Sequence, residues 1–273
     1  MRPMTQAPSP MSEPLVWNLV SAGYVTENVP LFTEYANDVL RIAKVGPVSN
    51  IGDVACGPGT LSFVAASLGA RVRALDFAED MIVRLQERAA REEQTLIEAV
   101  VGDGQALPWN NAEFDAVFSM FGLMFFPDRA RGFRELYRVL KPGGRAFVTS
   151  WAPLDRVPVM AAVFDSVRAA MPSMPFGANK ARLEELDEMR NEFEAAGFRD
   201  VETQTLTHAL VLPDVEALWA SLQKSLAPLV LLQHKLGPGF APIGAKIFAE
   251  LKRVLPSGPQ RAEMTANLGI GTR

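Results

Sequence analysis

The sequence predicts an α/β fold with an open, doubly wound, mostly parallel sheet. Short segments with strand character alternate with segments whose apolar residues fall at helical spacing, and a glycine-rich loop joins the first strand to a helix. The chain has 273 residues, of which 48% are hydrophobic and 21% charged. This composition is typical of a globular protein, and the length exceeds the roughly 100–200 residues of one ordinary domain. We therefore expect one domain with added segments.

The tail and the first helix precede the sheet. Residues 1–14 are rich in Pro, Ser and Met, and we expect them to form a disordered tail. Residues 15–273 are expected to form the single domain. The apolar residues that follow Pro30 recur every three or four positions, which predicts an opening helix over residues 31–43.

Seven segments are short, apolar or alternating, and bounded by turn residues, which is typical of strands. They are residues 51–55, 71–76, 96–101, 114–119, 145–151, 201–211 and 263–271. Helical segments separate most of them, with Asp128 as a predicted N-cap and with Gly69 and Gly197 as predicted helix ends. A strand that returns to the sheet through a helix lies parallel to its predecessor, so the alternation predicts parallel pairing.

Two segments interrupt this alternation, residues 152–182 and residues 214–258. The second carries apolar residues at helical spacing around Leu218 and Ile247. Together with residues 15–43, we expect both to form a helical lid over the carboxyl edge of the sheet, where open α/β sheets bind ligands.

Charge and composition exclude several classes of function. Lys and Arg number 27 and Asp and Glu 31, a net charge of −4 without the basic excess of a nucleic-acid-binding protein. One cysteine and two histidines permit neither an internal disulfide nor a Cys/His-rich metal site, so we expect no metal. The apolar runs fall short of the roughly 20 residues of a membrane span. We expect a cytoplasmic protein, and the sequence leaves open whether it forms a homodimer.

The loop after the first strand, Ala55-Cys-Gly-Pro-Gly59, narrows the choice of ligand. It lacks the third glycine of the dinucleotide fingerprint and the Gly-Lys-Ser/Thr ending of a P-loop. Asp76 ends the second strand, where a carboxylate can accept both hydroxyl protons of a ribose. A ribose without a phosphate cradle favours an adenosyl ligand.

Five successive motifs resemble those of class I S-adenosylmethionine-dependent methyltransferases, most closely the type 11 family of the ubiquinone and menaquinone biosynthesis type. The motifs are Asp53-Val-Ala-Cys-Gly-Pro-Gly-Thr60, Ala74-Leu-Asp-Phe-Ala-Glu-Asp-Met81, Gly102-Asp-Gly-Gln-Ala-Leu-Pro-Trp109, Phe114-Asp-Ala-Val117 and Arg138-Val-Leu-Lys-Pro-Gly-Gly144. The resemblance runs from about Tyr24 to Trp151, and residues 267–271 are similar to the last strand of that family. It implies a Rossmann-like sheet of seven strands with the last one antiparallel, and S-adenosylmethionine as the cofactor.

The resemblance assigns the methionine part of the cofactor to the first loop. Gly57 and Gly59 would let the backbone approach it, and Asp53 would lie near its ammonium group. Ser119 would lie near its carboxylate or methyl group, and Tyr24 would cover it from the N-terminal helix. Ser119 and Tyr24 could instead serve packing alone.

The same resemblance assigns the ribose to Asp76 and the adenine amino group to Asp103. The other residues near the adenine would be Phe77, Met81, Gly104 and Gln105. Gln105 could also be structural. One residue departs from the family pattern, because Ala55 stands where a glycine is usual, and a turn with positive φ would resist its methyl group.

The apolar residues 120–127 follow the fourth strand, where many relatives carry a histidine pair and this chain has none. They either belong to the core or line a pocket for an apolar or aromatic acceptor, for which Phe121, Met124 and Trp151 are the candidates. His234 in the lid is a weak candidate for a general base, because a histidine in such a segment is more often a solvated helix residue. His208 is expected to be structural or exposed.

The predicted activity is methyl transfer to a small apolar or aromatic metabolite, such as a quinone, a polyketide or another secondary metabolite. The sulfonium already activates its methyl group, so we expect proximity and desolvation to supply most of the catalysis. A catalytically inactive, cofactor-binding regulatory or assembly protein is the alternative, because of Ala55 and the missing histidines. A dinucleotide oxidoreductase is disfavoured by the missing third glycine.

Overall fold

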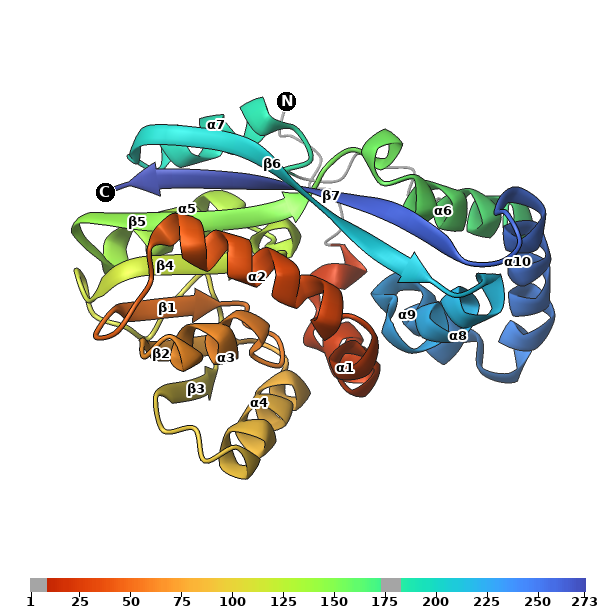
Figure 1. The fold of residues 1–273 in the computed structure, drawn as a ribbon, viewed down its shortest axis with the longest axis horizontal. Coiled ribbons are helices and arrows are strands. Elements are labelled where there is room, and N and C mark those ends of the chain that lie inside the picture. The colour runs from red at the N-terminus through yellow and green to blue at the C-terminus, as the bar shows by residue number, and fades with distance from the viewer. Residues whose placement is uncertain (1–8, 173–182) are drawn as a thin grey trace, which may run out of the picture.

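A computed structural model describes residues 9–172 and 183–273, and a single seven-stranded sheet forms its centre (Figure 1). The strands are β1 (Asn50–Val54), β2 (Arg71–Asp76), β3 (Ile97–Val101), β4 (Phe114–Met120), β5 (Leu140–Trp151), β6 (Arg199–Leu212) and β7 (Gln260–Thr272). Their order across the sheet is β3-β2-β1-β4-β5-β7-β6. Strands β1 to β5 pair in parallel, and β7 lies antiparallel between β5 and β6. The predicted fold class is confirmed.

The capping residues predicted at three helix ends are found there in the structure. The helices are α1 (Pro14–Glu27), α2 (Val29–Ala43), α3 (Thr60–Ser67), α4 (Glu79–Arg91), α5 (Arg129–Val139), α6 (Pro158–Ala170), α7 (Leu186–Ala195), α8 (Val215–Ser225), α9 (Ala227–Leu236) and α10 (Phe240–Val254). At the start of α5, Asp128 Oδ1 accepts a hydrogen bond of 2.9 Å from the backbone N–H of Arg131. Gly69 and Gly197 follow α3 and α7 with φ of +84° and +97°, a conformation that glycine adopts without strain.

Helices cover both faces of the sheet. On one face, α2, α3 and α4 bury a cluster in which the rings of Phe118 and Phe147 stack with centroids 5.0 Å apart. On the other face, α5 and α7 bury a second cluster, in which Phe133 and Phe193 meet edge to face at 4.9 Å. This two-sided burial explains why apolar residues of β4 and β5 point to both faces of the sheet.

The N-terminal segment differs from the predicted tail. A short 3-10 helix, η1, spans Pro10–Ser12, and α1 begins at Pro14. The Ser12 hydroxyl donates a 2.8 Å hydrogen bond to the carbonyl of Phe125, which ties the segment to the domain. Serine and proline are typical of disorder, but they are also favoured where helices start. The expectation of disorder is therefore wrong from residue 9 onward, and residues 1–8 lie outside the described part.

The segments expected to form a lid are helical where the structure describes them. Residues 152–182 contain the short helix η3 (Leu154–Arg156) and α6, and the end of that segment, residues 173–182, lies outside the described residues. Residues 214–258 contain α8, α9 and α10, joined in part by the turn η4 (Gly237–Gly239). No bounds were predicted for helix α9, whose apolar run contains Pro228. That proline lies in the first turn of α9, where it is compatible with a helix.

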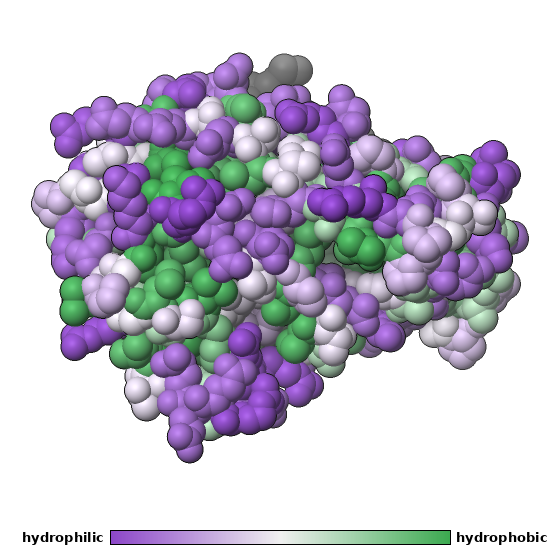
Figure 2. Space-filling view, in the orientation of Figure 1, coloured by the Kyte–Doolittle hydropathy of each residue, from purple (hydrophilic) through white to green (hydrophobic). Residues whose placement is uncertain are grey.

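Strands β6 and β7 carry these helices beyond the rest of the sheet. Strand β7 pairs with β5 only as far as Ala266, opposite Trp151, whereas β6 and β7 continue together to the pair Leu212 and Gln260. The resulting two-stranded ribbon reaches α6 and α10 on the right of Figure 1. Figure 2 shows a mostly hydrophilic surface, with a recess between the sheet and the α8–α10 group in which hydrophobic residues are visible.

No single helix within the described ranges has the length and hydropathy needed to cross a bilayer. Helix α8 and the stretch Ala227–Val254 meet that test only as a pair, across a bend of 73°.

Candidate cofactor site

A loop with unusual backbone angles connects β1 to α3. Ala55, Gly57 and Gly59 all have positive φ, of +59°, +54° and +84°. A Cβ atom on Gly59 would lie 2.8 Å from Cγ of Leu85 on α4, so a larger residue would collide there, whereas one on Gly57 would meet nothing within 4 Å. The loop therefore needs Gly59 for close packing and leaves open space beside Gly57.

Asp76, at the end of β2, holds this loop in place. Its Oδ2 accepts a 2.8 Å hydrogen bond from the N–H of Gly57, and its Oδ1 accepts one of 2.9 Å from the N–H of Ala78. Each carboxylate oxygen has a second lone pair, so the group can still accept two hydroxyl protons. Burial raises the pKa of Asp76 to about 6, although these backbone hydrogen bonds oppose the increase.

Asp53, on β1, is buried with half of its carboxylate unpaired. It is 1% exposed, and its Oδ2 accepts a 2.6 Å hydrogen bond from the Ser62 hydroxyl. Its Oδ1 has no hydrogen-bond partner among the described residues, and the same is true of the Ser119 hydroxyl at the end of β4. Burial, with a further contribution from Asp76, raises the pKa of Asp53 to about 7. An unpaired, buried carboxylate oxygen is suited to accept hydrogen bonds from a cationic ligand.

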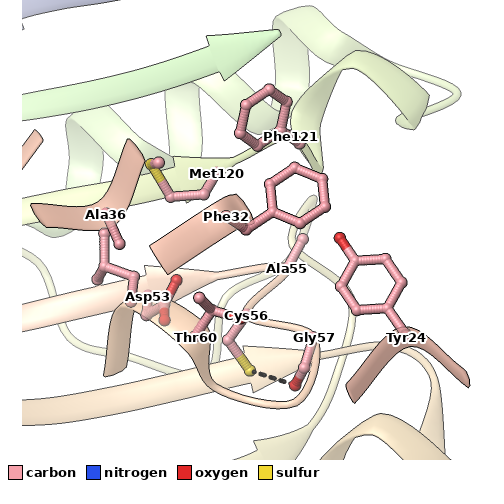
Figure 3. Close-up of a pocket in the computed structure, with 11 residues that line it drawn as sticks. Tyr24, Phe32, Ala36, Asp53, Ala55, Cys56, Gly57, Thr60, Met120 and Phe121 are labelled. Atoms are coloured by element: carbon pink, nitrogen blue, oxygen red, sulfur yellow. Dashed lines mark hydrogen bonds between the residues drawn. The ribbon is translucent and has the colours of Figure 1, made fainter. Parts of the chain in front are cut away.

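A small cavity lies between this loop and the two N-terminal helices (Figure 3). Its volume is about 40 Å³, and its lining residues are Tyr24, Phe32, Ala36, Asp53, Ala55, Cys56, Gly57, Thr60, Leu61, Met120 and Phe121. The rings of Tyr24 on α1 and Phe32 on α2 stack at 5.6 Å and close one side. Pockets for small ligands usually measure about 300–1,000 Å³. A cofactor would therefore need these two rings to move.

The titratable side chains around the cavity are in unusual environments. Burial, and secondarily the charge of Asp76, raises the pKa of the Tyr24 hydroxyl above its ordinary value. Burial likewise raises the pKa of the Cys56 thiol, which lies 3.4 Å from the carbonyl oxygen of Gly57. Both groups therefore remain protonated at neutral pH.

The residues assigned to the adenine lie near the end of β3. The N–H of Gly102 donates a 2.9 Å hydrogen bond to the carbonyl of Asp76, which brings Asp103 close to the ribose candidate. Asp103 is exposed, and its Oδ1 accepts from both the backbone and the side-chain N–H of Gln105, at 2.8 and 3.0 Å. Gln105 therefore contacts Asp103 directly. A Cβ atom on Gly104 would lie 2.4 Å from the ring of Phe126, so close packing requires this glycine.

Phe77 and Met81 are packed beneath the N-terminal helix. Met81 is 1% exposed and belongs to a cluster with Val16 and Val20 of α1 and with Leu231 of α9. Phe77 packs against the same cluster. Helices α1 and α9 therefore cover the side of the site that the adenine candidates occupy.

Of the three candidates for an acceptor pocket, Phe121 and Trp151 lie together, with ring centroids 4.5 Å apart. Phe32 adds a third ring at 4.7 Å from Phe121. Met124 lies elsewhere, in the core cluster on the α5 face of the sheet, so its assignment to the pocket is wrong. The physical reason is a change of direction at Phe121, which has a φ of +57°, after which the short helix η2 (Leu123–Phe125) turns toward α5.

The histidines lie outside this cavity. His234 is exposed on α9 and is not among the lining residues, so the structure does not bring the candidate base to the site. His208 on β6 lies 3.0 Å from Asp38 Oδ2 and packs edge to face against Tyr35, a structural role. No group of three or more His, Cys, Asp or Glu side chains is arranged to hold a metal ion within residues 9–172 and 183–273.

Six lining residues were absent from the predicted site: Phe32, Ala36, Cys56, Thr60, Leu61 and Met120. Helical spacing placed Phe32 and Ala36 on the apolar face of the opening helix. That pattern shows that a face is buried and does not show what covers it. Thr60 and Met120 directly follow the loop and the fourth strand, and their positions next to known motifs are the signal that could have identified them.

Comparisons with known proteins agree with this geometry. A family model described as a methyltransferase domain matches residues 52–148. A demethylmenaquinone methyltransferase from Clavibacter sepedonicus is 35% identical over 211 residues, which cover 70% of this chain and 84% of that protein. An uncharacterized protein from Mycobacterium tuberculosis is 42% identical over 113 residues, and the match spans only 41% of its length. Among solved structures, the match to the cyclase SpnF has a TM-score of 0.60 at 17% identity. It covers 97% of this chain and 96% of the SpnF chain.

The chain therefore belongs to the class I S-adenosylmethionine-dependent methyltransferases. Within that class it carries the domain of the type 11 family, whose model matches the segment from β1 to β5.

Proposed function

We propose that the protein transfers a methyl group from S-adenosylmethionine to a small apolar or aromatic acceptor. The observation that carries this proposal is the unpaired Oδ1 of Asp53, buried beside a glycine loop that Asp76 holds in place. An ammonium group and a vicinal diol are the two polar groups that such a pair of carboxylates accommodates. S-adenosylmethionine contains both.

Each residue of the site would then have a defined task. Asp53 would accept from the ammonium group, and Asp76 would accept from the ribose hydroxyls. Asp103 would accept from the adenine amino group. The bound cofactor supplies a methyl group that its sulfonium has already activated, so the protein needs to orient the acceptor and exclude water.

The acceptor would lie against the aromatic rings at the carboxyl ends of β4 and β5. Phe32, Phe121 and Trp151 form a contiguous wall with centroid separations of 4.5 to 5.7 Å. This wall carries no charge and suits a flat, apolar molecule. The demethylmenaquinone methyltransferase relative supports a quinone-like acceptor as one member of that class.

Ligand entry would require α1 and α2 to move outward. The cavity of about 40 Å³ is too small for the cofactor. The two helices meet at Asn28, so rotation at this position would move Tyr24 on α1 relative to Phe32 on α2 and open the stacked pair. Tyr24 and Phe32 would then close again over the bound ligand.

The second candidate is a protein that binds the cofactor without catalysis. Ala55 favours it, because its methyl group occupies a left-handed position in the cofactor loop, where glycine is usual and costs less strain. The fold does not decide between the two functions, since SpnF shares it and is named a cyclase.

Titration calorimetry with S-adenosylhomocysteine, followed by transfer of a labelled methyl group to a panel of quinones and phenols, tests both proposals. Asp76→Asn should weaken binding by roughly tenfold or more, because a hydrogen bond to a charged group is lost. Asp80→Asn, an exposed carboxylate in the first turn of α4, is the matched control and should bind like the wild type. Unchanged affinity in Asp76→Asn would refute the cofactor assignment. Binding without transfer to any acceptor would favour the second candidate.

A further inference from the structure

Helix α5 holds the loop that carries Asp103, and the first of its two contacts is at its N-terminus. The side chain of Gln105 bridges the two elements: its Nε2 donates to Asp103 Oδ1 at 3.0 Å, and its Oε1 accepts from the backbone N–H of Asp128 at 2.8 Å. Asp128 is the N-cap of α5. The carboxylate of Asp103 is thus linked to the start of the helix through one amide group.

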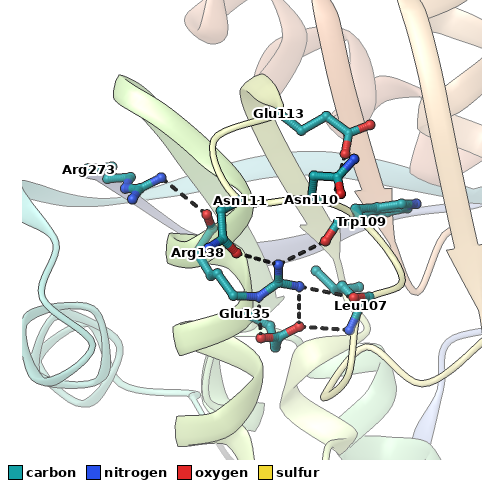
Figure 4. Close-up of polar contacts among 8 residues, drawn as sticks. All are labelled: Leu107, Trp109, Asn110, Asn111, Glu113, Glu135, Arg138 and Arg273. Carbon is teal, nitrogen blue, oxygen red and sulfur yellow. Dashed lines mark hydrogen bonds and ion pairs between the residues drawn. The ribbon is translucent and has the colours of Figure 1, made fainter.

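The second contact is near the C-terminus of α5, where Glu135 and Arg138 form a pair (Figure 4). Arg138 donates to the carbonyls of Trp109 and Leu107 at 2.8 and 3.0 Å. Glu135 Oε2 accepts from the N–H of Leu107 at 2.8 Å. Arg138 Nε and Glu135 Oε1 are 2.7 Å apart, with side chains 31% and 17% exposed. One ion pair therefore binds both polar groups of a single loop residue.

The loop between these contacts depends on them for its shape. Residues 102–111 contain neither helix nor strand, so few backbone hydrogen bonds fix their conformation. Both donors of Gln105 reach the same oxygen of Asp103, Oδ1. No hydrogen bond to Oδ2 is found among the described residues, which leaves this oxygen free to meet a ligand.

We propose that Gln105, supported by the Glu135–Arg138 pair, is a positioning residue that orients the free Oδ2 of Asp103 toward the amino group of the adenine. This inference rests on the proposed function. A carboxylate accepts a hydrogen bond from the 6-amino group of adenine and repels the 6-oxo group of hypoxanthine. Orientation of Asp103 therefore determines how strongly the site prefers an adenosyl ligand to an inosyl ligand.

Calorimetry measures this preference directly, with S-adenosylhomocysteine and S-inosylhomocysteine as the two probes. The wild type should bind the adenosyl compound about tenfold more tightly, because one charge-assisted hydrogen bond at an exposed carboxylate distinguishes them. Asp103→Asn should remove most of that preference. Gln105→Met, which keeps the length of the side chain without its amide, should reduce it to about two- to threefold. Arg138→Lys should have a similar effect, since lysine cannot hold two carbonyls in a fixed geometry.

Lys141→Met is the control, because Lys141 forms an exposed ion pair of 2.6 Å with Asp115 and does not contact the loop. It should keep the full preference. If Asp103→Asn loses the preference while Gln105→Met and Arg138→Lys both keep it, the positioning role is overturned and the cofactor site stands. If the wild type binds both compounds equally, Asp103 does not recognise the adenine and the inference fails. If the wild type binds neither, the proposed function itself fails. Gln105→Met alone decides the outcome should Arg138→Lys not fold.

Discussion

The methyl group of Ala55 lies directly against the backbone of Gly122. A Cβ atom on Gly122 would be 2.3 Å from the Cβ of Ala55, far inside van der Waals contact. Gly122 has φ of −100° and ψ of −50°, angles that any residue adopts, whereas Ala55 has a φ of +59°. Lack of space therefore explains the glycine at position 122, and the contact joins the loops that follow β1 and β4.

Exchange of these two residues should show that they are coupled. Gly122→Ala should lower the free energy of unfolding by about 1–3 kcal/mol, because the added methyl group collides with Ala55. Ala55→Gly removes the left-handed strain and should change stability by less than about 1 kcal/mol, since greater flexibility of the unfolded chain opposes the gain. The double variant should recover most of the loss in Gly122→Ala. Urea unfolding measures all three, and simply additive effects would contradict the contact.

Cofactor affinity should increase with pH. Burial holds the pKa of Asp53 at about 7 in the free protein, so a large fraction of the carboxylate is protonated at pH 6 and unable to pair with an ammonium group. We expect binding of S-adenosylhomocysteine to strengthen between about pH 6 and 8 and to release a proton near pH 6.5. Calorimetry in buffers of different ionisation enthalpy measures both quantities. Asp53→Asn should bind more weakly and with a flatter pH profile; an unchanged slope would assign the titration to another group.

Stability of the ligand-free protein should show the opposite pH dependence. Burial raises the pKa values of Asp53 and Asp76 to about 7 and about 6, whereas an unfolded chain releases these protons near pH 4. Between these values the unfolded state binds fewer protons than the folded state, so the free energy of unfolding falls as pH rises from about 4 to 7 and then levels off. Urea unfolding across this range tests the sign. Asp53→Asn should reduce the decrease, and a wild-type profile that rises instead would show that other groups dominate.

His234→Ala should leave the pH–rate profile of methyl transfer unchanged. The side chain is exposed on α9 and does not line the cavity, so it has no path to the acceptor in this conformation. Rates measured from pH 6 to 9 with an active acceptor provide the test. Loss of one limb of the profile in the variant would mean that α9 brings His234 to the acceptor when the helices move.

Local signals predicted the cofactor half of the molecule. Gly59 and Asp76 belong to strands and a loop that lie close together in the sequence. A local motif is therefore enough to predict that both residues lie at the cofactor site. Met124 could not be placed, because its side of the sheet depends on the left-handed angle of Phe121, which no local pattern indicates. Phe32 lies far from Phe121 in sequence, and only tertiary packing brings their rings to 4.7 Å.

Strand boundaries that depend on tertiary pairing were also not predictable from local sequence. Strand β5 begins at Leu140, earlier than predicted, because Leu140 pairs with Phe114 ahead of a register shift that contains Pro142 and Gly143. Proline and glycine are typical of turns, so the sequence predicts a strand only from residue 145. Irregular pairing of this kind accommodates both residues within a strand.

The extension of β6 and β7 beyond β5 separates the helices α8, α9 and α10 from the rest of the sheet. The chain leaves the sheet at Leu212 and returns at Gln260, two residues that are paired with each other. In topological terms, β6 and β7 are the arms of one hairpin whose connection has grown into the bundle of α8, α9 and α10. Since its two ends are fixed side by side, the sequence of this connection can diverge without altering the register of the strands or the loop at Asp53.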